Sequence, residues 1–86
     1  PASGEINRKV TGAVDVIGRI EKAYAGDALS IDHIDGVSME FTDWRFNIRA
    51  SNTEPLLRLN VESRGDVALV NARTEELLRV IGGEPG

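Results

Sequence analysis

The sequence predicts an α+β domain with two layers, in which two helices cover one face of a mainly antiparallel sheet of four to five strands. Two segments repeat apolar residues every three or four positions, which is typical of amphipathic helices. Between them, three segments alternate apolar and polar residues, which is typical of strands with one buried face. The chain has 86 residues, 41% of them hydrophobic, which is enough for one modest core. We therefore expect a single domain over residues 1–81, in the order (β)αββββα.

Both helices have recognisable ends. Residues 4–8 are expected to form a short leading strand, and the first helix follows Thr11, the predicted N-cap. Gly26 can adopt the left-handed backbone conformation that ends this helix. The second helix is expected to begin near Asp66, another N-cap residue type, and to end at Gly82. The apolar faces of the two helices consist of Ala13, Val16, Ile17, Ile20, Ala23 and Tyr24, and of Val70, Thr74, Leu77, Leu78 and Ile81.

The middle of the chain supplies the predicted sheet. Asp35-Gly36 predicts a tight type I′ hairpin turn, in which both central residues have positive φ. Leu29 and Ile31 predict a strand before this turn, and Thr42-Asp43 predicts a second tight connection. The aromatic residues of these strands are expected to pack in the core rather than to stack on nucleic-acid bases. The apolar positions of the three alternating segments are Val37, Met39, Phe41, Trp44, Phe46, Ile48, Leu57, Leu59 and Val61.

The composition excludes several classes of site and partner. Cysteine is absent, and the single histidine, His33, is expected as a half-exposed strand residue rather than a base. Fourteen acidic residues against ten basic ones give a net charge of −4, which disfavours nucleic acid as a partner. With neither a membrane-spanning apolar run nor a secretory leader, a cytoplasmic location is expected. We expect a piece of a longer protein, because the chain starts at Pro1, and a mobile end at residues 82–86.

One segment between two predicted strands, Arg49–Pro55, has the composition of an oxyanion site. Arg49 offers a planar fork of donors that matches the geometry of a phosphate. Ser51 and Thr53 add hydroxyl donors. Asn52 tolerates left-handed backbone geometry, which would let successive N–H groups point inward as an anion-binding nest. The segment is therefore a candidate phosphate-binding loop.

Polar side chains on the exposed face of the predicted sheet extend this candidate site. Arg58 could supply a second cation, whereas Arg45 either approaches the ligand or pairs with Glu40 across the hairpin. In the alternative interpretation, Ser-Asn-Thr is an ordinary turn and the arginines pair with surface carboxylates such as Glu40, Glu54 or Glu62. The composition of the loop leaves both interpretations open.

The loop and its surroundings also resemble a known family. Arg-Ala-Ser-Asn-Thr-Glu-Pro closely resembles the phosphate-binding loop in the C-terminal fourth domain of the α-D-phosphohexomutase superfamily. The resemblance continues through residues 3–8, 35–38, 44–47 and 59–66, and so covers nearly the whole chain. It is greatest to the bacterial phosphomannomutase branch, whose loop has Asn where many phosphoglucosamine mutases have Gly. It implies a TBP-like arrangement of the two-layer fold.

The resemblance implies a role within a larger enzyme. Members of the superfamily move a phosphoryl group reversibly between the 6- and 1-positions of a hexose, through a bisphosphorylated sugar. The implied ligands are mannose or glucose 1- or 6-phosphate and hexose 1,6-bisphosphate, and the implied partners are other domains of the parent chain, not nucleic acid or a membrane. The phosphoserine and the Mg²⁺ site of the family belong to other domains. This chain alone is therefore expected to be inactive, with no metal or other cofactor of its own.

The resemblance also assigns roles to single residues. Arg49, Ser51, Asn52 and Thr53 would grip the phosphate that is not transferred. Arg58 matches an arginine of related mutases, whereas other members place a second cation where this chain has Asn60, so the second cation stays open. The family's fourth domain closes over the substrate and excludes water. An alternative of another class is a stand-alone small α+β module that binds anions or RNA.

Overall fold

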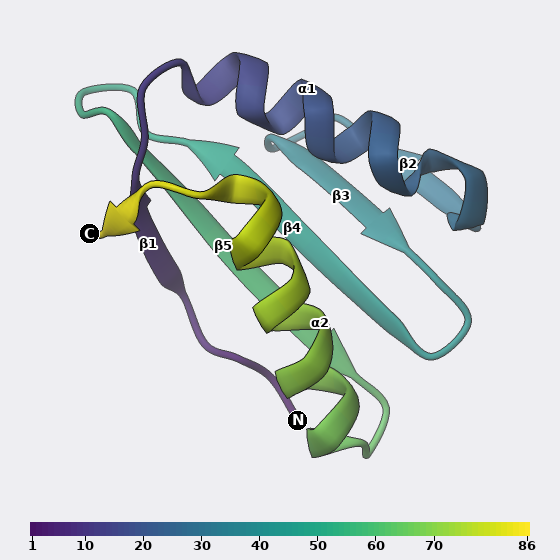
Figure 1. Cartoon of the computed structure of the whole chain (residues 1–86). Coiled ribbons are helices and arrows are strands. Elements are labelled where there is room, and N and C mark those ends of the chain that lie inside the picture. The colour runs from purple at the N-terminus through teal and green to yellow at the C-terminus, as the bar shows by residue number, and fades with distance from the viewer.

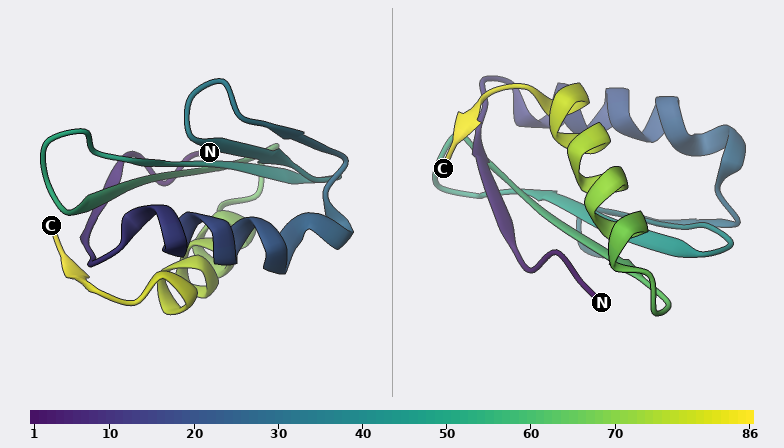
Figure 2. Two further views of the ribbon diagram at one scale, coloured as in Figure 1. Left: turned by 90° about the horizontal axis from the view of Figure 1, so that it is seen from above. Right: turned by 60° about the horizontal axis from the view of Figure 1, so that its bottom comes forward.

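Both helices lie on the same face of one six-stranded antiparallel sheet (Figures 1 and 2). The computed structural model describes the whole chain, residues 1–86. The strand order across the sheet is β2-β3-β4-β5-β1-β6, and every neighbouring pair is antiparallel. Along the chain, the elements are β1 (Ile6–Lys9), α1 (Ala13–Tyr24), the 3₁₀ helix η1 (Ala25–Asp27), β2 (Ser30–Asp32), β3 (Val37–Glu40), β4 (Trp44–Ala50), β5 (Leu56–Ser63), α2 (Val67–Ile81) and β6 (Glu84–Pro85).

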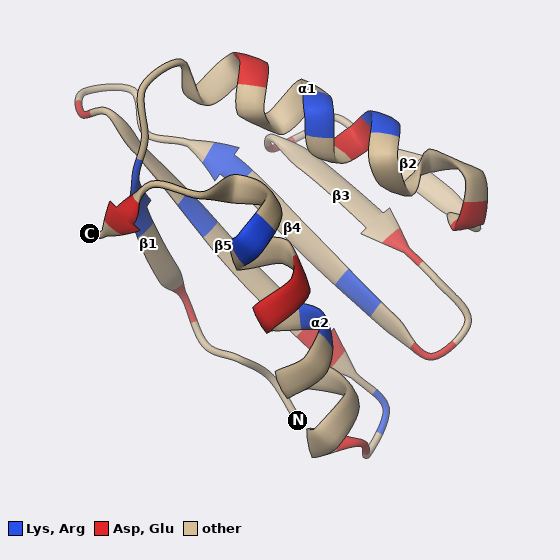
Figure 3. Ribbon diagram, in the orientation of Figure 1, with Lys and Arg blue, Asp and Glu red and all other residues tan.

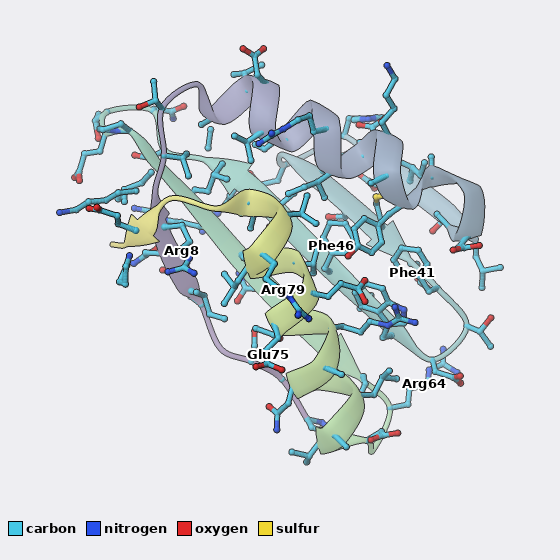
Figure 4. The ribbon with its side chains drawn as sticks, viewed as in Figure 1. Arg8, Phe41, Phe46, Arg64, Glu75 and Arg79 are labelled. Carbon is cyan, nitrogen blue, oxygen red and sulfur yellow. The ribbon has the colours of Figure 1, made fainter.

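The core lies between the two helices and the sheet. Sixteen residues are buried, and all of them are apolar. The nine apolar strand positions expected from the alternation are among them, because one face of β3, β4 and β5 points toward the helices. Figure 4 shows Phe41 and Phe46 on the face of the sheet that the helices cover. The predicted two-layer α+β class is therefore confirmed, although the sheet has six strands rather than four or five.

The ends of α1 differ from the prediction. Gly12, not Thr11, occupies the N-cap position, with φ of 70° and no capping hydrogen bond from a side chain. Gly26 does not end the helix in a left-handed conformation, since it lies within η1 and has no positive φ. The chain leaves α1 through a tighter helical turn instead. Composition alone did not distinguish these two ways of ending the helix.

The ends of α2 agree with the prediction. The carboxylate of Asp66 accepts a hydrogen bond of 2.9 Å from the backbone N–H of Leu69, as an N-cap should. At the other end, Gly82 has a φ of 68°, and its N–H donates to the carbonyl of Leu78 at 2.9 Å. A side-chain cap therefore begins this helix, and a glycine with positive φ ends it.

The connection between β2 and β3 is wider than a two-residue turn. Only Gly36 has a positive φ, 69°, so that Asp35-Gly36 does not form the predicted type I′ turn. β2 ends at Asp32, whose carboxylate accepts a 2.7 Å hydrogen bond from the N–H of Ile34. His33 lies in this connection rather than in a strand, and its Nε2 lies 2.8 Å from a carboxylate oxygen of Glu21 on α1.

Both ends of the chain pair with the sheet. Residues 84–85 form β6 against β1, which differs from the mobile end expected at 82–86. Gly83 makes this approach possible, because a Cβ at that position would lie 2.3 Å from the carbonyl oxygen of Lys9. At the other end, the N–H of Ser3 donates to the carbonyl of Val61 at 2.8 Å, and its hydroxyl accepts from the N–H of Val61 at 2.9 Å. The segment before β1 is thus bonded along β5.

Candidate functional site

The loop between β4 and β5 lies at one end of the two longest strands. Residues 51–55 connect them, and the N–H of Ser51 donates to the carbonyl of Leu56 at 2.9 Å. The carbonyl of Pro55 accepts a 2.9 Å hydrogen bond from the N–H of Val10, which follows β1. Figure 3 shows basic residues on β4 and β5 at the end of the sheet next to this loop. The loop is therefore anchored at both strands and at β1.

The loop residues differ in exposure and conformation. Asn52 and Thr53 are exposed, whereas Ser51 is half-buried. The N–H of Thr53 lies 3.4 Å from the hydroxyl oxygen of Ser51. Asn52 does not have the predicted positive φ, so the left-handed nest expected here is not formed. The donors that remain in the loop are hydroxyl groups, the Asn52 amide and exposed backbone N–H groups.

Arg49 and Arg58 lie directly opposite each other on the polar face of the sheet, immediately before and after the loop. The neighbouring strand residues Ile48 and Leu57 point to the core, so both arginines project from the other face. The Nε atoms of both guanidinium groups are buried and have no hydrogen-bond partner. Like charges directly opposite in a sheet are destabilising. The pair therefore forms a place where an anion would be favoured.

Arg58 has a polar neighbour on its other side. Asn7 on β1 is its antiparallel partner, and the Oδ1 atom of Asn7 is also buried without a hydrogen bond. Arg8 carries a buried Nε without a partner as well, but it pairs with Leu57 and so lies on the helix-covered face. The row Arg49–Arg58–Asn7 is consequently the polar row that borders the loop.

Arg49 forms the two ion pairs of this region. Its Nη1 lies 3.2 Å from Oδ2 of Asp35, and its Nη2 lies 3.4 Å from Oε1 of Glu5. The pairs expected with Glu40, Glu54 or Glu62 are not formed, and Arg58 takes part in no ion pair. Of the two carboxylates that hold Arg49, neither was singled out from the sequence.

The structure separates the two remaining candidate residues. Asn60 lies opposite Asn47 in the row next to the arginine pair, on the same polar face. Arg45 lies four residues before Arg49 on β4, which is about 13 Å along an extended strand. It lies opposite Glu40 and Glu62 in register but forms no ion pair. The structure thus brings together Arg49, Ser51, Asn52, Thr53, Arg58 and Asn60, and leaves Arg45 at a distance.

A second polar cluster, which sequence analysis did not find, joins the helices on the other side of the sheet. The hydroxyl of Tyr24 donates a 2.5 Å hydrogen bond to Glu76, which also accepts from Arg73 at 3.3 Å. The Arg73 guanidinium lies 5.0 Å from the centre of the Trp44 ring. These four residues border a cavity of about 400 Å³ at the β3–β4 turn. Burial, together with the hydrogen bond and charge of Glu76, raises the pKa of the Tyr24 hydroxyl well above its ordinary value.

No group of three or more His, Asp or Glu side chains is arranged to hold a metal ion. Neither helix combines the length and the apolar character that a membrane crossing requires. The arginine pair and its loop carry guanidinium, hydroxyl and amide donors, a set whose chemistry matches the oxygen atoms of an oxyanion.

Comparisons with known proteins place the chain in a family. Residues 5–80 match the family model for the C-terminal domain of phosphoglucomutase/phosphomannomutase. A phosphomannomutase of Escherichia coli K12 is 58% identical over 81 residues, which are 94% of this chain and 18% of that protein. A protein of Xanthomonas campestris named for phosphohexose mutases is 51% identical over 83 residues, 96% of this chain and 18% of its own length.

A solved structure shows the same fold. It is a phosphoglucomutase/phosphomannomutase family protein of Burkholderia thailandensis, which superposes with a TM-score of 0.69 at 23% identity and covers 99% of this chain and 19% of its own. The chain thus spans about a fifth of the length of the relatives that it matches. On the family match and the identity to these relatives, the chain belongs to the family of phosphoglucomutase/phosphomannomutase C-terminal domains.

Proposed function

We propose that this chain is the part of a phosphomannomutase that grips the non-transferred phosphate of the sugar and helps to close the active site over it. The parent enzyme would interconvert mannose 6-phosphate and mannose 1-phosphate. The observation that carries this proposal is the position of Arg49 on β4 directly opposite Arg58 on β5, at the base of the loop. The names of the relatives supply the reaction and the substrate class.

The two opposed arginines of the site favour an anionic ligand. Two arginines occupy opposed positions on β4 and β5, and only Arg49 forms ion pairs with carboxylates. Each buried Nε has one N–H that lacks an acceptor. A phosphate dianion offers enough oxygen atoms to accept from both groups at once, and such charge-assisted hydrogen bonds contribute about 1.5–3 kcal/mol each. The hydroxyls of Ser51 and Thr53 would add donors from the loop.

The openness of the loop suits a phosphate that arrives from either end of a sugar. Asn52 and Thr53 are exposed, and the polar row behind them contains arginine and asparagine side chains rather than an enclosed sugar pocket. Hydrogen bonds directed at the phosphate alone accept the 1-phosphate and the 6-phosphate equally. A bisphosphorylated intermediate could then turn over and present its other end to the same loop.

Some properties of the parent stay predictions. Mg²⁺, which the family resemblance implies, would be held by another domain of the parent. Asn60 is proposed as a neutral neighbour of the phosphate rather than a cation substitute, since it lies beside the arginine pair. The cytoplasmic location and the domain limits 1–81 are likewise predictions.

An NMR titration of the 86-residue chain tests the phosphate grip directly. Mannose 6-phosphate and mannose 1-phosphate should each shift the backbone amides of residues 51–53 and the Nε–H signals of Arg49 and Arg58. Affinity near the millimolar range is expected, which corresponds to about 4 kcal/mol. Arg49→Ala should abolish the shifts. Arg79→Ala is the matched control, because Arg79 is an exposed arginine on α2, in the helical layer.

In the intact parent, Arg49→Ala should lower kcat/KM by about 10- to 100-fold, through the loss of one charged phosphate contact. Arg79→Ala should leave kcat/KM unchanged. Equal kinetics for wild type and Arg49→Ala, or shifts in the isolated chain that do not depend on Arg49, would contradict the proposal.

A further inference from the structure

Two carboxylates hold the arginine that we assign to the phosphate. Asp35 and Glu5 lie at different terminal nitrogens of Arg49, at 3.2 and 3.4 Å. They come from segments far apart in the chain, 14 and 44 residues away from Arg49. Both carboxylates are open to solvent, with 68% of the Asp35 side chain and 47% of the Glu5 side chain exposed. The Arg49 side chain is itself 36% exposed, so a ligand from solution can reach its terminal nitrogens.

The position of Asp35 is built into the fold. A Cβ at Gly36 would lie 2.3 Å from the carbonyl oxygen of Ile48 and 2.6 Å from Cβ of Arg49, so only glycine allows this approach. The carbonyl of Asp35 accepts a 2.8 Å hydrogen bond from the side-chain amide of Asn47 on β4. The close approach at Gly36 and the hydrogen bond from the Asn47 side chain thus fix the backbone of Asp35 independently of the ion pair.

The ion pairs are long for charge-assisted hydrogen bonds. Such contacts between a guanidinium and a carboxylate are typically about 2.7–2.9 Å, whereas the two here measure 3.2 and 3.4 Å. Exposed ion pairs of this kind are weak and screened by salt. The negative charges of Asp35 and Glu5 nevertheless offset the repulsion between Arg49 and Arg58, which lie opposite each other. No other carboxylate forms an ion pair with either arginine.

We propose that Asp35 and Glu5 are competing anions, which neutralise Arg49 while the site is empty and yield it to the incoming phosphate. This inference rests on the proposed function, because it concerns the same arginine. The exchange moves no covalent bond: the phosphate oxygens replace two carboxylate oxygens as acceptors for the guanidinium. The carboxylates remain close and repel the bound dianion. They therefore weaken the grip and favour release, as a sugar that must leave the loop and turn over requires.

A phosphate titration of neutral variants tests the proposal. Inorganic phosphate is added at low ionic strength to wild type, Asp35→Asn, Glu5→Gln and the double variant, and the Arg49 Nε–H signal is followed by NMR. Each single variant should bind phosphate about 2- to 5-fold more tightly, from the loss of one weak competing ion pair. Without phosphate, each should melt at a lower temperature than wild type, and phosphate should raise its melting temperature more than that of wild type.

Glu62→Gln is the matched control, since it removes one negative charge from the same sheet face without touching Arg49. It should change the phosphate affinity less than the other two variants. If Asp35 and Glu5 only held Arg49 in position, their substitution would have the opposite effect and would weaken phosphate binding. Unchanged or weaker binding in Asp35→Asn and Glu5→Gln, with Arg49-dependent binding in wild type, would overturn this inference alone. Absence of any phosphate effect in wild type would overturn the proposed function as well.

Discussion

The hydroxyl of Tyr24 on α1 donates a 2.5 Å hydrogen bond to the carboxylate of Glu76 on α2. Tyr24 also packs edge-on against the rings of Phe41, Trp44 and Phe46, with centroid distances of 5.7 to 6.1 Å. One side chain therefore ties both helices to the strands beneath them. Its hydroxyl is partly buried beside a charged partner, and its ionisation is therefore coupled to folding.

Alkaline pH should unfold the chain through Tyr24. Burial and Glu76 raise the pKa of this hydroxyl in the folded state, so its stabilising effect is complete below the unfolded-state pKa of about 10 and declines above it. Melting temperatures measured between about pH 9 and pH 11 should fall more steeply for wild type than for Tyr24→Phe. Tyr24 is the only tyrosine, so tyrosinate absorbance reports its titration directly. Parallel melting curves for the two proteins would contradict the coupling.

Arg58→Met should separate stability from binding. The substitution keeps an unbranched side chain and removes one of the two positive charges that lie opposite each other on β4 and β5. We expect the free energy of unfolding at low salt and without phosphate to rise by about 0.2–1 kcal/mol, the range for an opposed pair on a sheet. The phosphate-induced shifts should disappear. Thermal melts at low and high salt check the first effect, and lower stability at low salt would contradict it.

Gly36→Ala should be far more damaging than Gly26→Ala. Gly36 has a φ of 69°, and an added Cβ would lie 2.3 Å from the carbonyl oxygen of Ile48. The positive φ alone costs about 1–3 kcal/mol, and β4 must shift as well. Gly26 is helical and has no heavy atom within 4 Å of the added Cβ, so its substitution should be neutral or slightly stabilising. Urea unfolding of both variants makes the comparison, and equal losses would contradict it.

Asp66→Ala should destabilise α2 by about 1 kcal/mol, because the backbone N–H of Leu69 loses its acceptor. Thr11→Ala is the control at the start of α1, where the side chain makes no capping hydrogen bond. It should leave the free energy of unfolding nearly unchanged. Chemical denaturation of the two variants tests both statements. A larger loss for Thr11→Ala than for Asp66→Ala would contradict the assigned helix starts.

The alternation of apolar and polar residues and the helix cap at Asp66 predicted the central strands and the start of α2. The turn before β3 and the last strand depend on contacts between residues far apart in the sequence. The alternation predicted that Phe46 and Leu59 lie on the buried face of their strands, and Asp66 predicted where α2 begins. The turn at Asp35-Gly36 did not follow, because its geometry depends on contact with Asn47 and β4. β6 was not predicted, since two residues carry no periodic signal and their partner is strand β1.

At the candidate site, too, the sequence identified single residues but not the contacts between them. Sequence singled out Arg49 and Arg58 separately, and only the strand register shows that they face each other. The prediction of a left-handed conformation at Asn52 was wrong, because the five-residue loop closes without a positive φ. Asp35 and Glu5 were not recognised as partners of Arg49, since the three residues meet only through sheet pairing and the approach at Gly36.

The bonding of the first residues along β5 has a mechanical consequence. Ser3 is tied to Val61 by two hydrogen bonds, and the N–H of Ser63 donates to the carbonyl of Pro1 at 3.1 Å. A displacement of this leading segment would therefore act directly on β5, the strand that carries Arg58.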